Sequence, residues 1–96
     1  MGYTIRISQE ASRDIRRYKK KSPKVYIRIL KVLDIMLEKP FSNGLKTHQV
    51  TTSKYGGAYS TRVTGDIRIL WELQKKDIDI IAIGGHSGKY TVYICL

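Results

Sequence analysis

The sequence is poor in cysteine and has no long apolar run. Its single cysteine, Cys95, cannot form an internal disulfide and lacks the neighbouring ligands of a zinc site, so we expect it to pack at the end of the chain. No stretch approaches the roughly 20 apolar residues that a membrane-spanning helix requires. The first residues alternate in polarity and do not resemble a signal peptide. These absences predict a cytoplasmic protein.

Acidic residues are also scarce. The chain has 18 lysine and arginine residues against eight aspartate and glutamate residues, which gives a formal net charge of +10. Such a positive field attracts phosphate backbones and speeds encounter with them, so the composition favours a nucleic-acid partner over an acidic protein or an anionic membrane. The basic residues in the range 13–24 are compatible with a solvated helix surface, a phosphate-binding face or a docking strip for an acidic partner.

The length of 96 residues predicts one small domain, residues 1–96. Residues 3–7 alternate in polarity and predict a strand, after which Ser8 caps a helix that runs to about Lys20. A second helix begins at Pro23 and ends at Lys39, antiparallel to the first. Apolar residues recur in it at three- and four-residue steps and predict one core stripe, made of Tyr26, Ile29, Leu30, Leu33, Met36 and Leu37.

The second half of the chain predicts an antiparallel meander. Residues 58–63, 67–73 and 78–83 read as strands joined by tight turns, and Trp71 is expected in the core. The pattern of residues 45–52 fits either a short strand or an ordered loop. A strand, a helical hairpin and a meander together predict an α+β fold with the helices packed on one face of the sheet.

Two histidines, His48 and His86, are the candidates for proton transfer. His86 follows an apolar strand and two glycines, where a side chain is exposed at the end of a sheet. An unperturbed imidazole titrates near pH 6.5 and exchanges protons in either direction at neutral pH. RNA cleavage needs a base for the 2′-hydroxyl, an acid for the departing 5′-oxygen and cations for the phosphate, so both histidines and Arg62 could perform it without metal.

Two further residues have a structural and a functional interpretation. Asp66 either forms hydrogen bonds within a Thr-Gly-Asp turn or orients a histidine or an arginine. Tyr90 either packs under the last segment or stacks on an unpaired base, and it lies beside His86 if residues 87–93 form a helical turn.

Two sequence blocks resemble the RelE/ParE superfamily of toxins from toxin–antitoxin pairs, most closely RelE and YafQ. They are Arg62-x-x-Gly65-Asp66-x-Arg68-Ile69-x-Trp71 and Gly85-His86-Ser87. The resemblance covers nearly the whole chain and implies a RelE-like sheet with helices on one face. It also implies an endoribonuclease that needs no cofactor, cuts mRNA in the ribosomal A site and is silenced by a cognate antitoxin.

The same resemblance implies roles for individual residues. His86 corresponds to a general acid, His48 to a base, Tyr90 to the aromatic residue that contacts the RNA base, Asp66 to the turn aspartate and Arg62 to a phosphate-stabilising group. The further RNA-binding candidates are Lys46, Lys54, Arg68 and Lys89.

One position departs from the family pattern. Four residues before His86, where an arginine is usual, the chain has Ala82. Either Arg68, Lys46 or Lys54 replaces that arginine, or the activity is weaker than in typical members.

Two other functions remain open at the level of sequence. ParE-like members share the fold but inhibit DNA gyrase by binding it, without nuclease chemistry and generally without such a set of His48, His86 and Tyr90. A plain basic RNA-binding domain would leave both histidines and Asp66 without a joint purpose. The ribonuclease is therefore the favoured interpretation.

Overall fold

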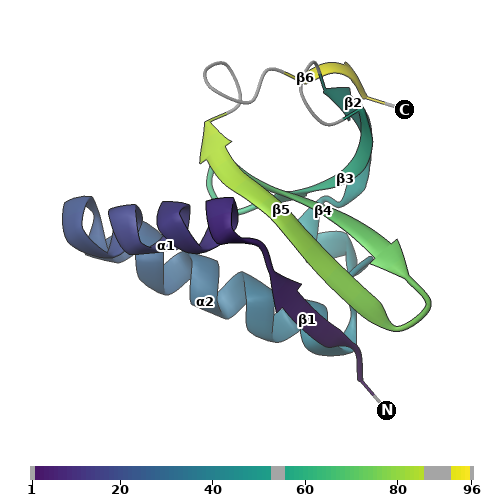
Figure 1. Cartoon of the computed structure of the whole chain (residues 1–96), viewed down its shortest axis with the longest axis horizontal. Helices are drawn as coiled ribbons and strands as arrows, with labels where there is room; N and C mark the ends of the chain where they lie inside the picture. Colours follow the sequence, from purple (N-terminus) through teal and green to yellow (C-terminus); the bar gives the residue numbers. More distant parts are fainter. Residues whose placement is uncertain (1, 53–55, 86–91, 96) are drawn as a thin grey trace.

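In the computed structural model, residues 2–52, 56–85 and 92–95 are described, and they form a six-stranded sheet with two α-helices on one of its faces (Figure 1). The first half contains β1 (Thr4–Ile7), α1 (Gln9–Lys21), α2 (Pro23–Glu38) and a short 3-10 helix, η1 (Asn43–Leu45). The second half contains β2 (His48–Thr52), β3 (Gly56–Arg62), β4 (Ile67–Gln74), β5 (Asp77–Gly85) and β6 (Val92–Cys95).

The strand order is β1-β5-β4-β3-β2-β6. Strands β3 to β5 form the predicted antiparallel meander, which β2 extends by one more antiparallel strand, and the predicted helical hairpin is confirmed with only Ser22 between its helices (Figure 1). The sheet as a whole is mixed, because β1 lies parallel to β5 at one edge and β6 lies antiparallel to β2 at the other. The ambiguous stretch 45–52 contains both kinds of structure, the end of η1 and then β2.

The buried side of α2 is rotated slightly from the predicted stripe. Leu30 is 44% exposed, so its place in the core stripe was wrong, and Tyr26 and Leu37 are only half-buried. Successive side chains of a helix point in directions about 100° apart around its axis. A row of side chains spaced at i, i+3, i+4 and i+7 can therefore face the sheet while Leu30 points outward. The buried row is Ile29, Val32, Leu33 and Met36. Neither α1 nor α2 is long and apolar enough to cross a membrane.

Trp71 is completely buried, as predicted, and begins a chain of hydrogen bonds. Its Nε1–H donates to Thr61 Oγ1 over 2.7 Å, Thr61 Oγ1 lies 2.7 Å from Thr47 Oγ1, and Thr47 Oγ1 donates to the Pro40 carbonyl over 2.9 Å. The carbonyl can only accept, so the single proton of Thr47 goes to it and Thr61 must donate to Thr47. The chain therefore connects β4 and β3 to the residue that precedes His48.

Replacing Thr61 with valine tests this chain. Valine keeps the side-chain shape but leaves the buried Trp71 N–H without an acceptor, so we expect the free energy of unfolding to fall by about 1–3 kcal/mol. Urea denaturation measures the change. The matched control is Thr51→Val at an exposed position of β2. Equal stability of the two variants would contradict the proposed importance of the chain.

An ion pair connects β1 and β5 at the edge of the sheet. Arg6 Nε lies 2.6 Å from Asp79 Oδ1 and Arg6 Nη2 lies 3.0 Å from Asp79 Oδ2. The hydrogen bonds from Arg6, together with its charge, lower the pKa of Asp79. The ionised pair therefore adds to stability above the ordinary aspartate pKa, and this share is lost as the pH falls through the lowered value.

The Arg6→Ala variant should move the pKa of Asp79 back up toward its ordinary range. An NMR titration of the Asp79 carboxyl carbon measures this, with Lys75→Ala as a control that removes a cation elsewhere. If Asp79 titrates identically in the Arg6→Ala variant and the wild type, the guanidinium does not stabilise the carboxylate.

Candidate functional site

The register of four strands brings the described site candidates to one end of the sheet. His48, at the start of β2, is the partner of Ser60 in β3. Two residues further along β3, Arg62 is the partner of Arg68 in β4, which is in turn the partner of Gly84 in β5. Because register partners lie on the same side of a sheet and side chains alternate, the backbone positions of these residues share the side opposite the helix-packed core. The Arg62 side chain nevertheless lines a hollow together with residues of α2 and η1.

The His48 ring is oriented by the backbone. Its Nδ1 lies 2.9 Å from the carbonyl oxygen of Lys46, a residue in the left-handed conformation with φ of 54°. A carbonyl oxygen accepts and cannot donate, so Nδ1 carries the proton in this contact. In the neutral ring the lone pair is then on Nε2, which has no hydrogen-bond partner within the described residues. Nε2 is thus the atom of the neutral His48 ring that can accept a proton.

Arg62 and Arg68 are directly opposed on neighbouring strands. Like charges at such positions are destabilising unless an anion lies between or near them. Neither guanidinium forms an ion pair with a carboxylate in the part of the chain that the structure describes. Lys46 adds an exposed cation at the same end. The arrangement suits a ligand that carries phosphate groups.

The contacts in the tight turn between β3 and β4 bear on the two interpretations of Asp66, which were hydrogen bonding within the turn and orientation of a histidine or an arginine. Thr64 Oγ1 accepts the hydrogen bonds that close the turn, from the Asp66 N–H over 3.2 Å and from the Ile67 N–H over 3.0 Å. The Asp66 carboxylate instead lies against Gly85, with Oδ2 3.5 Å from the position that a Cβ of Gly85 would take. The side chain is therefore directed toward the residue that immediately precedes His86.

Ala82 occupies an apolar place on the same side of the sheet. It is completely buried and packs with Val50 and Leu70. Gly84, two residues further along β5, is the register partner of Arg68. Arg68 is one of the three cations considered as a replacement for the missing arginine. Its register partner is only two residues from Ala82, the position where that arginine is usual.

Four of the predicted residues, Lys54, His86, Lys89 and Tyr90, lie outside the described part of the chain, and their roles stay predictions. The helical turn over residues 87–93 that would place Tyr90 beside His86 does not extend to its stated end, because Val92 and Tyr93 belong to β6. Pairing with β2 extends the sheet at that point in place of a helix.

The sequence interpretation missed how α1 secures the strand that precedes His86. Since β1 pairs with β5 only as far as Ile80, the following edge of β5 has no strand partner on that side among the described residues. Ser8 Oγ donates to the Ile81 carbonyl over 2.8 Å, and the buried Asp14 accepts the Ile83 N–H at Oδ2 over 3.0 Å. The one available signal was the i,i+3 spacing of Asp14 and Arg17, which form an ion pair of 3.1 Å.

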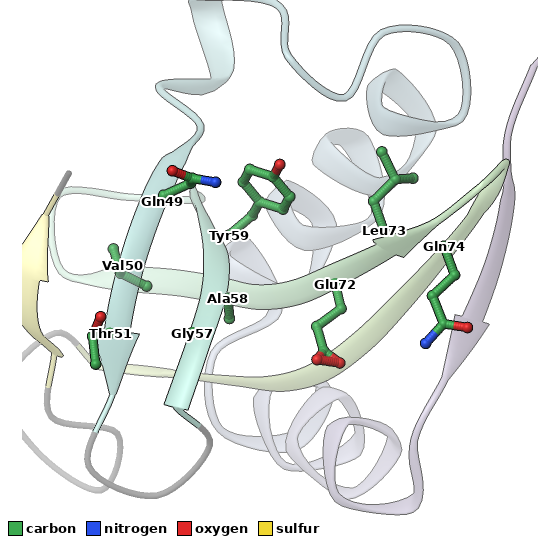
Figure 2. Close-up of a pocket in the computed structure, with 9 residues that line it drawn as sticks. All are labelled: Gln49, Val50, Thr51, Gly57, Ala58, Tyr59, Glu72, Leu73 and Gln74. Atoms are coloured by element: carbon green, nitrogen blue, oxygen red, sulfur yellow. The ribbon is translucent and has the colours of Figure 1, made fainter.

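A hollow of about 350 Å³ opens elsewhere, where β3 and β4 diverge beyond the pair Tyr59–Trp71 (Figure 2). Its lining includes Gln49, Glu72 and Gln74 but none of the predicted site residues. It lies toward the opposite end of β3 from Arg62 and is not part of the candidate site. Among the residues that the structure describes, no three His, Cys, Asp or Glu side chains gather as metal ligands would.

No protein-family model matches the sequence, and no curated protein is similar to it. Solved structures are similar in fold. The archaeal RelE–RelB complex from Pyrococcus horikoshii matches with a TM-score of 0.71 and 20% identity, over 91% of this chain and 98% of the other. The DinJ–YafQ toxin–antitoxin complex of E. coli matches with a TM-score of 0.72 and 18% identity, over 91% and 96% of the two chains.

A YoeB/ParE toxin from Agrobacterium tumefaciens matches with a TM-score of 0.73 and 14% identity, over 86% of this chain and 98% of the other. Each of the three matches covers at least 86% of this chain and at least 96% of the other. The chain therefore has the fold of the RelE/ParE superfamily of toxins.

Proposed function

We propose that the chain is the toxin of a toxin–antitoxin pair and that it cleaves mRNA in the ribosomal A site. The observation that carries the proposal is the orientation of His48, whose Nδ1 contact with Lys46 leaves Nε2 available at the cationic end of the sheet. A protein that only binds a partner has no need of a base held in this way. The fold of the RelE and YafQ toxins supports the same function.

The proposed reaction is a metal-independent transesterification. His48 Nε2 takes the proton of the 2′-hydroxyl, and the resulting oxyanion attacks the neighbouring phosphorus. The bond from phosphorus to the 5′-oxygen breaks, and His86 gives a proton to that oxygen. The products are one fragment with a 2′,3′-cyclic phosphate and one with a 5′-hydroxyl.

The remaining site residues support this proton transfer. Arg62 and Arg68 stabilise the negative charge that accumulates on the phosphate oxygens during attack. Asp66, which lies against Gly85, orients the imidazole of the next residue, His86. Tyr90 stacks on an unpaired base and holds the scissile bond in place. Lys46, Lys54 and Lys89 contact the backbone of the mRNA or of the ribosomal RNA.

The proposed partners are an antitoxin and the translating ribosome. Two of the similar structures are complexes of a toxin with its antitoxin, RelE with RelB and YafQ with DinJ. The net charge of +10 favours association with ribosomal RNA.

Primer extension after expression of the chain tests the proposal. The same message is examined in a translated form and in a form whose start codon has been removed. We expect new 5′ ends only in the translated message. Intact RNA together with inhibited DNA supercoiling would contradict the proposal and indicate a gyrase inhibitor of the ParE kind.

The role of Arg68 predicts a change in salt dependence. Loss of one phosphate contact should weaken RNA binding at all sequences and reduce the slope of log affinity against log salt by about 1. Fluorescence anisotropy with a labelled single-stranded RNA at several salt concentrations compares Arg68→Ala with Lys75→Ala, which removes a cation from the β4–β5 turn. Identical slopes for these two variants would show that Arg68 makes no phosphate contact.

A further inference from the structure

Strand β5 contains a bulge at Ile81, shortly before its end. The register between β4 and β5 shifts there by one residue, which leaves Ile81 without a partner in β4. An extra residue of this kind bends its strand and changes the direction of the side chains beyond it. Residues 82–85 follow the bulge and lead directly to His86. The course of β5 after the bulge therefore decides where His86 begins.

The beginning of α1 holds β5 along this stretch. The Ser8 N–H donates to the Ile80 carbonyl over 3.1 Å, at the point where the pairing with β1 ends. Ser8 Oγ donates to the carbonyl of the bulged Ile81 over 2.8 Å. Further along, the Ile83 N–H donates to Asp14 Oδ2 over 3.0 Å. Groups of a helix thus take the place of a strand along this edge of β5.

Asp14 stands out in this set because its carboxylate is buried, with 1% of the residue exposed. Burial of a carboxylate is costly unless charges and hydrogen bonds compensate it. Oδ1 lies 3.1 Å from Arg17 Nη1, while Oδ2 accepts the Ile83 N–H. An apolar residue at position 14 would avoid the cost of the charge, but it would leave the buried Ile83 N–H without this acceptor. The burial of Asp14 is therefore connected with holding one backbone amide of β5.

The segment that follows Ile83 contacts the candidate site. Gly84 is the register partner of Arg68, and the Asp66 carboxylate lies against Gly85. Glycine has the largest conformational freedom of all residues. A restraint immediately before two glycines therefore has a large effect on the direction in which the chain continues.

We propose that Asp14 is a positioning residue for His86 in the cleavage of RNA. By accepting the Ile83 N–H, Asp14 fixes β5 beyond the bulge and so determines where the general acid meets the departing 5′-oxygen. Ser8 assists at the Ile81 carbonyl, whereas the role of Arg17 is to stabilise the buried carboxylate. The inference rests on the proposed function, since it connects Asp14 to the acid of that reaction.

Three variants separate the hydrogen bond of Asp14 from its ion pair. Asp14→Ala removes both, Asp14→Asn keeps an acceptor oxygen for the Ile83 N–H but loses the charge, and Arg17→Met removes the ion pair alone. The cleavage rate at saturating translating ribosomes should fall about tenfold or more in Asp14→Ala, because a displacement of about 1 Å can cost roughly 10²-fold. The ribosome concentration that gives half this rate should not change, because the loss occurs in the transition state. Asp14→Asn and Arg17→Met should be less stable to urea but should keep the wild-type rate.

An mRNA with sulfur in place of the departing 5′-oxygen distinguishes positioning of the acid from a general loss of structure. A thiolate leaves without protonation, so Asp14→Ala should approach the wild-type rate on this substrate. Ser8→Gly provides the same test in a milder variant, because glycine at this position keeps most of the helix-capping stability but cannot bind the Ile81 carbonyl. It should be slower than the wild type on the oxygen substrate alone. The matched control is Asp34→Ala, the same change as Asp14→Ala at an exposed position of α2, which should have no effect on either substrate.

Hydrogen exchange of the isotope-labelled chain, followed by NMR, checks the structural step without ribosomes. The Ile83 amide should exchange about tenfold faster or more in Asp14→Ala, since a buried hydrogen bond is lost. In Asp14→Asn it should exchange as in the wild type. The amide shifts of Gly84 and Gly85 should change in Asp14→Ala but not in Asp34→Ala.

Three results would overturn the proposal while the wild type cleaves RNA. They are a wild-type rate in Asp14→Ala, a defect that the sulfur substrate does not relieve, and unchanged exchange of the Ile83 amide. If Asp14→Ala does not fold, Ser8→Gly decides through its rates on the two substrates, and equal defects on both would count against the proposal. A wild-type chain that leaves translated mRNA intact would instead overturn the proposed function, and with it the role of Asp14 in cleavage. The two failures are therefore distinguishable.

Discussion

The His48→Ala variant should cleave translated mRNA roughly 10²–10⁴ times more slowly than the wild type, the usual contribution of one acid–base group. The reason is the loss of Nε2, the ring atom that carries the free lone pair when Nδ1 donates to the Lys46 carbonyl. Quantitative primer extension on purified translating ribosomes measures the rate. Gln49→Ala, the same change at the next residue of β2, should leave it unchanged.

A second variant at this position separates catalysis from positioning. In His48→Asn the amide can still donate to the Lys46 carbonyl, but it offers no base. We expect this variant to be as slow as His48→Ala. Recovery of the wild-type rate in His48→Asn would show that His48 is needed only for the local backbone structure.

The His86→Ala variant should lose a similar factor of roughly 10²–10⁴ in the cleavage rate, because the departing 5′-oxygen then has no proton donor. An mRNA with sulfur in place of that oxygen at the scissile bond provides a specific check, since a thiolate leaves without protonation. On this substrate His86→Ala should approach the wild-type rate, whereas His48→Ala should remain slow. Equal defects of His86→Ala on both substrates would remove His86 from the role of acid.

The two histidines should also act as a unit. When two groups serve one transition state, their removal is strongly non-additive. The double variant His48→Ala with His86→Ala should therefore be little slower than the more damaged single variant. Multiplication of the two separate factors would indicate that the residues contribute to different steps.

The fold was predictable where local pattern decides the structure. The meander follows from apolar runs and turn residues, and its strands differ from the predicted ones by at most two residues at either end. The parallel placement of β1 beside β5 was not predictable, because it depends on contacts between residues more than 70 positions apart, such as Arg6 with Asp79. The placement of Leu30 failed because apolar residues occupy both sides of α2.

The candidate site was predictable as a set of residue types rather than as a geometry. The backbones of the candidates His48, Arg62, Asp66 and Arg68 lie at one end of the sheet, although the Arg62 side chain lines a hollow beside α2. The hydrogen bond that orients His48 depends on the left-handed backbone of Lys46, and no sequence pattern indicates it. The position of Arg62 beside the hollow along α2 depends on where β2 begins. Both features arise from the path of the backbone, which local sequence pattern does not specify.

The chemistry of the RNA ends tests the nuclease assignment most directly. Purified chain is added to ribosomes that translate a defined message, and the fragments are analysed by mass spectrometry. A 2′,3′-cyclic phosphate on the upstream fragment and a 5′-hydroxyl on the downstream fragment are expected from proton transfer by imidazoles. Ends that carry a 3′-hydroxyl and a 5′-phosphate, or a message that remains whole, would contradict the account.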